Sequence, residues 1–347
     1  MNGPCGADTD RGAPGAPSTL PSMRYGFLGP ETTFTHQALL KALTEIPEEF
    51  RAEEPELVPF ASVATATTDL LAGEIDALMA PIENSVEGGV SGTLDVLAAT
   101  DSITIVAEQT VQITFVLAAR EETALEQLTT VSSHPHAQAQ VQGWLRENVS
   151  GAHIAAASST AAAARDLAAM SEDEAWGRAA VCSPLAAEHF GLAVLAEGIE
   201  DHAGAITRFV LVTREGRIPA RTGTDKTTVV IQLPHNRSGA LLEALEILGS
   251  NGVNMSRIES RPIGDFLGRY SFSLDLEGHI EDRRVAAALR SLHRLCPVVH
   301  YLGSYPRTDG GSTEVREDYA DHAYDEAHVW LERLAGMITP TDPTTEI

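Results

Sequence analysis

The segment with the strongest chemical character is residues 81–90 (PIENSVEGGV), where an apolar stretch ends abruptly in a polar loop. Glu83, Asn84 and Ser85 stand in a row, and two glycines, Gly88 and Gly89, follow them. Glycines allow a backbone to approach a ligand closely, and binding residues concentrate on loops of this kind. A simple surface turn has no need of three such polar side chains in succession. The segment is therefore predicted to contact a ligand.

A second polar group, Thr207-Arg208, stands at the mouth of the otherwise apolar strand expected at Phe209–Val212. Two polar residues at the end of a buried strand are also explained as solvated edge residues. Arginine, however, suits carboxylate recognition, because its planar guanidinium forms paired hydrogen bonds with carboxylate oxygens.

Four expected strand-to-helix junctions share one design: small hydroxyl or amide side chains where a helix begins. They are residues 29–35 (GPETTFT), 83–85 (ENS), 133–136 (SHPH) and 158–160 (SST). The first backbone N–H groups of a helix have no partner within it, and together with the helix dipole they bind anions. At any single junction, ordinary helix capping explains these residues. All four on one side of one fold indicate a cleft for a small ligand with several negative charges.

Other site types find little support. His134 and His136 stand two residues apart, without the further His, Cys or Asp partners that a metal site needs. Ser133 precedes His134, but no Gly-x-Ser-x-Gly elbow surrounds it. The glycines form no G-x-G-x-x-G fingerprint after a strand, which argues against a dinucleotide.

The charge balance excludes several partners. The 347 residues include 24 basic and 49 acidic side chains, for a net charge of -25. Such a field repels nucleic acid and anionic membranes, so neither is expected as a partner. An anionic substrate must then be captured by local groups.

Composition also indicates the compartment. The sequence holds no run of 18 or more apolar residues, and residues 1–22 read as a disordered leader rather than a secretory signal. Cys5, Cys182 and Cys296 form no paired motif, which is typical of the reducing cytoplasm. We therefore expect a cytoplasmic protein.

Between residues 24 and 213, short apolar runs alternate with alanine- and leucine-rich helical stretches, which predicts parallel sheet covered by helices. Strands are expected at 24–28, 57–60, 77–82, 103–116, 130–132, 153–156, 178–182 and 206–212, and helices near 35–43, 63–72, 92–99, 137–148, 160–170 and 184–189. The length and the long strand halfway indicate two lobes. The cleft between them is the expected site, at the carboxyl ends of the strands.

A polar linker at 214–226 leads to a different unit. Residues 227–305 show the order βαββαβ, which is the ferredoxin-like plan. The acidic tail, 306–347, carries apolar residues at three- and four-residue steps around Trp330, so part of it is expected to form an amphipathic helix. The pattern leaves open whether that helix docks or stays mobile.

These segments resemble prephenate dehydratase from about residue 24 to 306. The matching motifs are residues 29–31 (GPE) with 33–35 (TFT), 81–88 (PIENSVEG), 133–135 (SHP), 159–162 (STAA) and 207–209 (TRF). Beyond the linker, residues 239–242 (GALL) and 259–262 (ESRP) look like the two phenylalanine-binding motifs of the ACT domain in these enzymes. Any one motif is weak, but the set in this order is highly specific.

The resemblance implies an α/β fold with a bilobal, periplasmic-binding-protein-like catalytic domain (type II) at 23–213 and an ACT regulatory domain at 227–305. One lobe would take residues 24–102 plus 192–213, and the other 103–191. The family works without cofactor or metal, usually as homodimers or homotetramers.

Site residues carried over from the resemblance are the catalytic Thr207 and the substrate-binding Thr33, Asn84, Ser85, Ser133, Gln140 and Arg208. Three positions depart from the family. Thr32 stands where Gly is common, His136 stands where Gln is common and so receives no role, and Ile206 lacks the Asn often found before the threonine.

Phenylalanine is expected to bind where residues 236–242 of one regulatory domain face 259–262 of a neighbour, and to inhibit from there. The residues are Asn236, Gly239, Ala240, Leu241, Leu242, Glu259, Ser260, Arg261 and Pro262. The start of the Gly239 helix suits the carboxylate of the amino acid. A surface ion pair between Glu259 and Arg261 is the alternative. Deletion from Thr227 onward is expected to keep turnover and abolish phenylalanine sensitivity.

The implied reaction is the decarboxylative dehydration of prephenate to phenylpyruvate. In this hypothesis Thr207 donates a hydrogen bond to the leaving hydroxyl. Arg208 and the N–H groups of helix starts hold carboxylate, or Arg208 instead braces the loop. Two alternatives remain: arogenate dehydratase, which performs the same reaction on the aminated substrate, and a non-catalytic amino-acid sensor, which the fold alone does not exclude.

Overall fold

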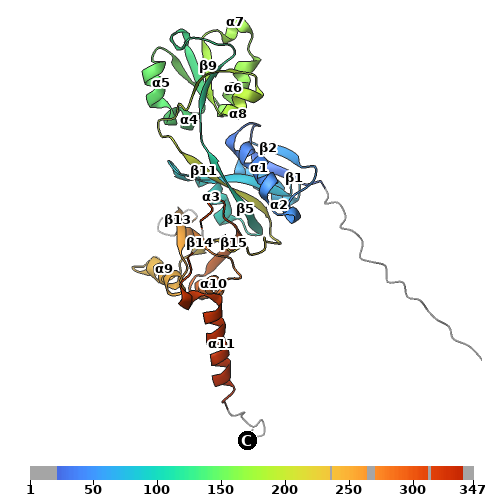
Figure 1. The fold of residues 1–347 in the computed structure, drawn as a ribbon, viewed down its shortest axis with the longest axis vertical. Helices are drawn as coiled ribbons and strands as arrows, with labels where there is room; N and C mark the ends of the chain where they lie inside the picture. Colours follow the sequence, from blue (N-terminus) through green and yellow to red (C-terminus); the bar gives the residue numbers. More distant parts are fainter. Residues whose placement is uncertain (1–21, 235–236, 264–269, 312–313, 339–347) are drawn as a thin grey trace, which may run out of the picture.

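Two lobes, a C-terminal domain and a projecting helix follow one another along the long axis of the molecule (Figure 1). The computed structural model describes residues 22–234, 237–263, 270–311 and 314–338. Two predictions fall on other residues. Residues 1–21 of the expected leader, and Asn236 of the expected phenylalanine site, lie outside the described residues.

The first lobe is built on a mixed sheet of order β2-β1-β3-β11-β5, with β4 pairing to β3. Strands β1, β2 and β3 are parallel, whereas β11 runs antiparallel to both of its neighbours. The bounds are β1 Arg24–Leu28, β2 Glu56–Phe60, β3 Ala77–Asn84, β4 Gly88–Gly89, β5 Ile103–Gln112 and β11 Ile206–Arg214, with helices α1 Phe34–Glu45, α2 Val63–Ala72 and α3 Ser91–Ala99 and the 3-10 turn η1 Glu48–Phe50.

Strand β11 shows how this sheet divides its core. Side chains alternate between the two faces of a strand. Phe209 and Leu211 pack into a cluster with α1, while Val210 and Val212 pack into a second cluster on the opposite face. Such a strand is buried on both sides, which explains why its sequence reads as a continuous apolar run.

The second lobe contains a five-stranded sheet of order β10-β6-β9-β7-β8. Its strands are β6 Val116–Ala119, β7 Thr130–Ser133, β8 His153–Ala156, β9 Arg178–Cys182 and β10 Ala193–Glu197, and its helices are α4 Pro135–Gln140, α5 Gln142–Asn148, α6 Thr160–Ala169, α7 Glu172–Ala175 and α8 Pro184–His189, with the 3-10 turn η2 Leu125–Gln127. The single helix expected at 137–148 is thus two helices that meet at Val141.

The strand pairing corrects the predicted lobe boundaries. The long strand expected at 103–116 is divided into β5, which belongs to the sheet of the first lobe, and β6, which belongs to that of the second. Strand β10, assigned by sequence to the first lobe, pairs with β6. The chain therefore crosses between lobes at residues 113–115 and returns after Glu197. Apolar character continues across the crossing, so no boundary is visible there in the sequence.

The C-terminal domain has the predicted βαββαβ order and the antiparallel sheet order β13-β14-β12-β15 of the ferredoxin-like plan. Its elements are β12 Asp225–Gln232, α9 Ala240–Ser250, β13 Met255–Pro262, β14 Tyr270–Glu277, α10 Arg283–Leu295 and β15 Val298–Pro306.

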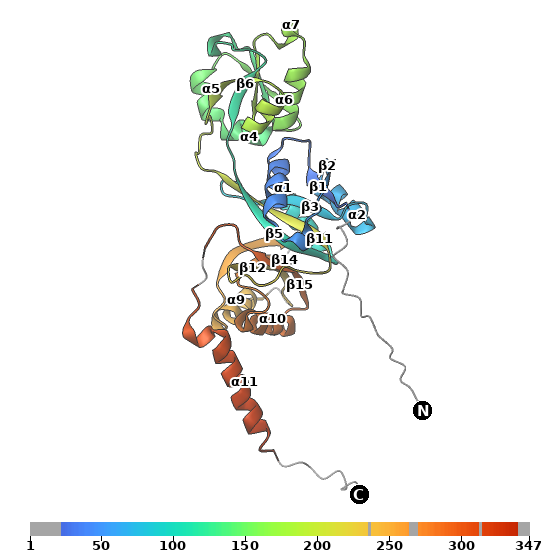
Figure 2. The same cartoon turned by 45° about the vertical axis from the view of Figure 1, so that its right-hand side comes forward.

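This domain lies against the sheet of the first lobe (Figure 2), and the two share an apolar core. Val230, Leu302 and Tyr305 belong to the same apolar cluster as Ile105 and Val210 of the first lobe. Deleting the domain would expose that apolar face to water. Truncation at Thr227 is therefore expected to disturb the first lobe itself, against the prediction that the truncated chain keeps its turnover. Point substitutions can change the ACT domain without exposing this core.

The tail forms the expected helix, α11 Asp321–Ala335, preceded by a 3-10 turn, η3 Glu317–Tyr319. Asp321 pairs with Arg221 at 2.7 Å and Asp325 with Arg283 at 2.9 Å, so the start of α11 is tied to the body. The rest projects away, and Trp330 is 55% exposed. Among the described helices, none is long and apolar enough to cross a membrane.

Candidate active site

The centre of the candidate site is a hydrogen bond between the two segments that the sequence singled out. Thr207, near the start of β11, lies opposite Asn84, at the end of β3. The Asn84 side-chain amide Nδ2 donates to Thr207 Oγ1 at 2.8 Å. Because this hydroxyl accepts from Asn84, its own proton remains to be donated to a ligand.

The loop after β3 is arranged so that Asn84 is held in place. Its Oδ1 accepts from the backbone N–H of Val86 at 2.8 Å and of Glu87 at 3.1 Å. Ser85 joins the loop to β11, since its Oγ accepts from the Ile206 N–H at 2.9 Å and its own N–H donates to the Ile206 carbonyl at 2.9 Å. The position of Thr207 thus depends on this loop.

One of the four predicted helix starts is wrong. Residues 83–85 lead into the two-residue strand β4, and helix α3 begins only at Ser91. The Asn84 side chain bonds to its own loop and to Thr207 rather than to a helix end. The other three junctions do begin helices, and in each a side chain caps the helix as the simpler explanation held: Thr33 for α1, His134 for α4 and Ser159 for α6.

The first junction contacts the second lobe. Thr33 Oγ1 donates to the Leu28 carbonyl at 2.9 Å and accepts from the His36 N–H at 3.3 Å. Thr32 has φ of 66°, in the left-handed region, which accounts for the glycine common at this position in the resembling family. Its carbonyl accepts from Ser183 Oγ of the second lobe at 3.2 Å.

His36 supports this loop in its neutral form. Its Nδ1 accepts from the Thr32 N–H at 3.0 Å, and its ring stacks on Phe27 with centroids 4.7 Å apart. Burial lowers the pKa of His36 below its usual value, with Glu31 opposing that shift. A neutral imidazole is the form that can accept this hydrogen bond.

Two predicted ligands of the second lobe differ in accessibility. Ser133 is fully buried, and its hydroxyl donates to the Val181 carbonyl at 2.7 Å. Gln140 reaches across to the first lobe, where its Nε2 donates to Glu87 Oε1 at 3.0 Å. The other oxygen of Glu87 contacts His136 Nδ1 at 3.0 Å. Glu87 therefore bridges the lobes beside Asn84 and Ser85.

A cavity of about 330 Å³ lies between the lobes. Residues from two of the four junctions face it, together with the segment after β2. The lining residues are Gly29, Pro30, Pro59, Phe60, Ala61, Ser158 and Ser159.

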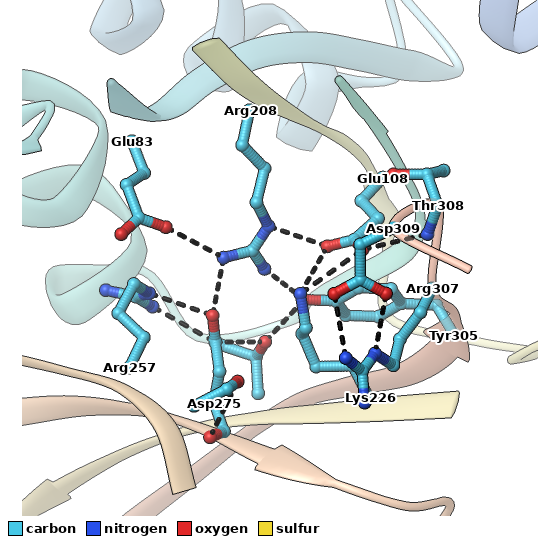
Figure 3. Close-up of polar contacts among 12 residues, drawn as sticks. Glu83, Glu108, Arg208, Lys226, Arg257, Asp275, Tyr305, Arg307, Thr308 and Asp309 are labelled. Carbon is cyan, nitrogen blue, oxygen red and sulfur yellow. Dashed lines mark hydrogen bonds and ion pairs between the residues drawn. The ribbon is translucent and has the colours of Figure 1, made fainter. Parts of the chain in front are cut away.

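Arg208 does not join this group. Thr207 and Arg208 are consecutive in a strand, so their side chains leave on opposite faces. The Arg208 guanidinium donates to Glu108 at 2.6 Å, to Asp275 at 2.5 Å and to Tyr305 at 2.9 Å (Figure 3). These partners lie between the first lobe and the C-terminal domain. The carboxylate-binding role predicted for Arg208 has no support in this geometry.

The electrostatics of this buried group are those of a strong ion pair. Burial by itself would lower the pKa of Arg208 and raise that of Asp275. The mutual attraction outweighs burial, so the pKa of Arg208 lies well above its usual value and that of Asp275 well below. Both groups are therefore charged at neutral pH.

The predicted phenylalanine motifs lie at two places in the C-terminal domain. Gly239 caps α9 with φ of 85°, followed by the buried Ala240, the half-buried Leu241 and the exposed Leu242. On β13, Ser260 and Pro262 are exposed, whereas Glu259 lies against Gly89 of the first lobe. The structure does not test whether phenylalanine binds there.

Arg261 pairs with Asp95 rather than with Glu259, the partner in the alternative explanation of this motif. Its guanidinium binds both carboxylate oxygens of Asp95 in α3, at 2.7 and 3.0 Å, and Ser91 Oγ at 3.2 Å. The motif at 259–262 is thus bonded to the helix that follows the Asn84 loop.

Four residues that bond to predicted site residues were not singled out from the sequence: Glu87, which bonds to Gln140, and Glu108, Asp275 and Tyr305, which bond to Arg208. For Glu108 a signal existed, since an acidic residue in the apolar run 103–116 requires a buried partner. Nothing in the sequence identified that partner as Arg208.

The fold and the cleft define a class: a two-lobed, type II periplasmic-binding-protein-like unit joined to an ACT domain. A family model described as prephenate dehydratase matches residues 25–217, and one described as ACT domain matches residues 227–294. The prephenate dehydratase of Mycolicibacterium gilvum is 43% identical over 319 residues, covering 91% of this chain and 98% of that protein.

Solved structures agree. The prephenate dehydratase of Arthrobacter aurescens in complex with L-Phe is 46% identical, with a TM-score of 0.81 over 90% of this chain and 99% of that one. GqqA, described as a novel type of quorum quenching acylase, is 28% identical, with a TM-score of 0.70 over 82% of this chain and 98% of its own. The chain belongs to the prephenate dehydratase family.

Proposed function

We propose that this protein converts prephenate to phenylpyruvate and that phenylalanine inhibits it through the ACT domain. The observation that carries the proposal is the Thr207 hydroxyl, held by Asn84 at 2.8 Å between the two motifs that identify the family. A pure binding module has no need of a hydroxyl held in this way.

In the reaction, the bond between the ring and its carboxylate and the bond between the ring and its hydroxyl break together, which releases carbon dioxide and hydroxide. The ring becomes aromatic, so the chemistry is downhill once hydroxide can leave. In our proposal Thr207 donates a hydrogen bond to the departing oxygen and stabilises its developing charge. Donors placed in this way are worth about 10²–10³-fold in turnover.

The remaining side chains position the dianion. Asn84 orients Thr207, while Ser85 and Gln140 approach the same region from the two lobes. Thr33 and Ser133 stay proposed ligands, and to donate to substrate their hydroxyls must release the Leu28 and Val181 carbonyls. We assign no substrate contact to Arg208. Because the overall field of the protein is strongly negative, the dianion must be held by such local N–H and hydroxyl donors.

Feeding the purified protein both candidate substrates tests the assignment. Prephenate should yield phenylpyruvate, whereas the rival arogenate reaction would yield phenylalanine from arogenate. Turnover of arogenate alone would replace the proposal by that rival. Binding without turnover of either compound would leave an amino-acid sensor.

The ACT domain supports phenylalanine control because the solved relative from Arthrobacter aurescens is a complex with L-Phe. We propose that the same amino acid binds residues 239–242 and 259–262 here, between two copies of the chain. This arrangement requires a homodimer or homotetramer, which we propose works in the cytoplasm. Light scattering with and without phenylalanine measures the assembly.

A further inference from the structure

Arg208 and its partners form a group that the reaction does not use directly. We call it the interdomain polar cluster: Glu83, Glu108 and Arg208 from the first lobe, with Lys226, Arg257, Asp275 and Tyr305 from the ACT domain (Figure 3). We propose that Arg208 is a positioning residue through which Asp275 of the ACT domain sets the place of Thr207. Turnover and the phenylalanine response would then depend on one buried contact, an inference that rests on the proposed dehydratase function.

The cluster is closely bonded and, apart from the Glu83 side chain, which is 38% exposed, it is buried. Asp275 and Tyr305 are fully buried, and Glu108 is 2% exposed. Lys226 Nζ reaches the two oxygens of Glu108 at 3.2 and 2.9 Å, and Arg257 Nε reaches Asp275 at 2.8 Å. Every charge in such a place needs a partner, because an unpaired buried charge is strongly destabilising.

Neither domain balances its own charge here. The first lobe supplies two carboxylates and one cation, whereas the ACT domain supplies two cations and one carboxylate. The six charged groups are neutral together only when the domain is seated on the lobe. A displacement of the ACT domain must therefore be felt at Arg208.

Arg208 in turn contacts both strands that carry the site. It follows Thr207 directly in β11, and its Nη1 lies 3.4 Å from Glu83, the residue before Asn84. Thr207 and Arg208 stay paired with Asn84 and Glu83, and the register of β11 against β3 shifts directly after them, between Arg208 and Phe209. Irregularities of this kind next to active sites commonly re-aim a side chain. The guanidinium adds a constraint on both strands at this irregularity.

The cluster also reaches the proposed phenylalanine site. Arg257 pairs with Asp275 across β13 and β14, and its Nη2 donates to Ser273 at 2.8 Å. Glu259, the first residue of the motif at 259–262, stands two positions further along β13 and opposite Ser273. A shift of β13 on binding phenylalanine has a continuous path of contacts: Arg257, Asp275, Arg208 and then Thr207.

The simpler explanation is that the cluster only holds two domains together. That explanation predicts lower stability but unchanged turnover per folded molecule when a bond is removed. Positioning predicts lower turnover with little change in KM, because the loss falls on the transition state rather than on binding. The two explanations therefore give different kinetics for the same substitution.

The test is Asp275→Asn in the full-length protein, compared with Asp225→Asn. Asp225 is a matched control: it is 1% exposed and lies in the same sheet, and its carboxylate bonds only to Thr222 and Gly223 among the described residues. We expect Asp275→Asn to lower kcat roughly 10- to 100-fold, as small misplacements do. Its half-inhibiting phenylalanine concentration should rise at least about fivefold. Asp225→Asn should retain both values.

Tyr305→Phe provides a variant that preserves volume in case Asp275→Asn does not fold. It removes a hydroxyl that bonds Arg208 at 2.9 Å and Thr228 at 2.6 Å. We expect a smaller loss of kcat in the same direction, together with a weakened phenylalanine response. Equal kcat or equal phenylalanine sensitivity in the Asp275 and Asp225 variants overturns the inference.

Hydrogen–deuterium exchange separates this inference from the dehydratase proposal, because it needs no substrate. Residues 206–209 should exchange faster in Asp275→Asn than in Asp225→Asn, and phenylalanine should alter their exchange only while Asp275 is intact. If wild-type protein releases no phenylpyruvate but this exchange pattern holds, the reaction is wrong and the coupling stands. If turnover is present and exchange is alike in both variants, only the coupling fails.

Discussion

The first lobe has two interfaces, and they are built in different ways. Toward the second lobe the described polar contacts are few: Glu87 with Gln140 and His136, which are exposed, and Ser183 with Thr32, which is buried. One aromatic pair, Phe34 with Phe115, adds an apolar contact. Toward the ACT domain there is a continuous apolar core and a buried ionic cluster. From this difference we expect the lobes to separate more easily than the ACT domain separates from the first lobe.

This contrast suits a regulated enzyme. Substrate must enter between the lobes, so that junction should be weak and reversible. In our proposal a signal from the ACT domain reaches Thr207, so that junction should transmit displacement rather than absorb it. Substitutions at the ACT interface should therefore cost more stability than substitutions at the junction of the lobes.

Removing the buried carboxylate of the ACT interface should have the largest effect on stability. Asp275→Asn leaves Arg208 and Arg257 with too little negative charge, and breaking a buried pair costs about 3–5 kcal/mol. Denaturant unfolding at pH 7 measures the loss. A loss below that of an exposed pair, about 1 kcal/mol, would show that the cluster is solvated.

The same variant predicts a pH dependence. The pKa of Asp275 is depressed in the folded protein by Arg208 and Arg257 against the effect of burial, and its unfolded value is about 4. Its contribution to stability is therefore fully present above about pH 4 and is lost as the pH falls further toward the folded pKa. The stability gap between wild type and Asp275→Asn should be constant from pH 7 to pH 5 and shrink in stronger acid. A gap that widens in acid contradicts the assignment.

The close approach of β15 to β5 should give the next largest effect. A Cβ at Gly303 would stand 2.3 Å from the Ile105 carbonyl oxygen, at a φ of 136°. Gly303→Ala should destabilise by roughly 2–4 kcal/mol, the sum of backbone strain and overpacking. Gly310→Ala is the control, because Gly310 also has positive φ but no atom within 4 Å of an added Cβ. Equal losses of stability at both glycines would show that a clash between β15 and β5 does not cause the effect at Gly303.

The lobe junction should respond least. Glu87→Gln weakens contacts with Gln140 and His136 that are partly exposed, and such pairs contribute about 0–1 kcal/mol. We expect little change in unfolding but a shift in KM, since closure of the cleft is affected. A stability loss as large as that of Asp275→Asn would make the two interfaces equivalent.

The sequence predicted elements well where local pattern decides them. Helix α2 at 63–72 was predicted to the residue, and the βαββαβ order of the ACT domain is confirmed. It failed where pairing between distant segments decides, as at the crossing after Gln112 and in strand β10. Apolar runs do not reveal which sheet they join.

The same limit applies to the site. Thr207 and Asn84 were both singled out from sequence, and the structure brings them together. Arg208 was assigned to the cleft because its chemistry suits a carboxylate, but the partners it meets are Glu108 and Asp275. Residue type predicted the kind of partner correctly. Which face of β11 carries Arg208, and what covers that face, depends on contacts about 70 to 100 residues away in the chain.

Turnover of prephenate by Thr207→Ala beside Thr207→Ser tests directly whether the Thr207 hydroxyl assists departure of the ring hydroxyl. Serine keeps the hydroxyl that accepts from Asn84 and donates to the leaving group, so much of the activity should remain. Alanine removes it, and kcat should fall about 10²–10³-fold while the fold persists. Equal, mild losses in the two variants would contradict a role for this hydroxyl in the reaction.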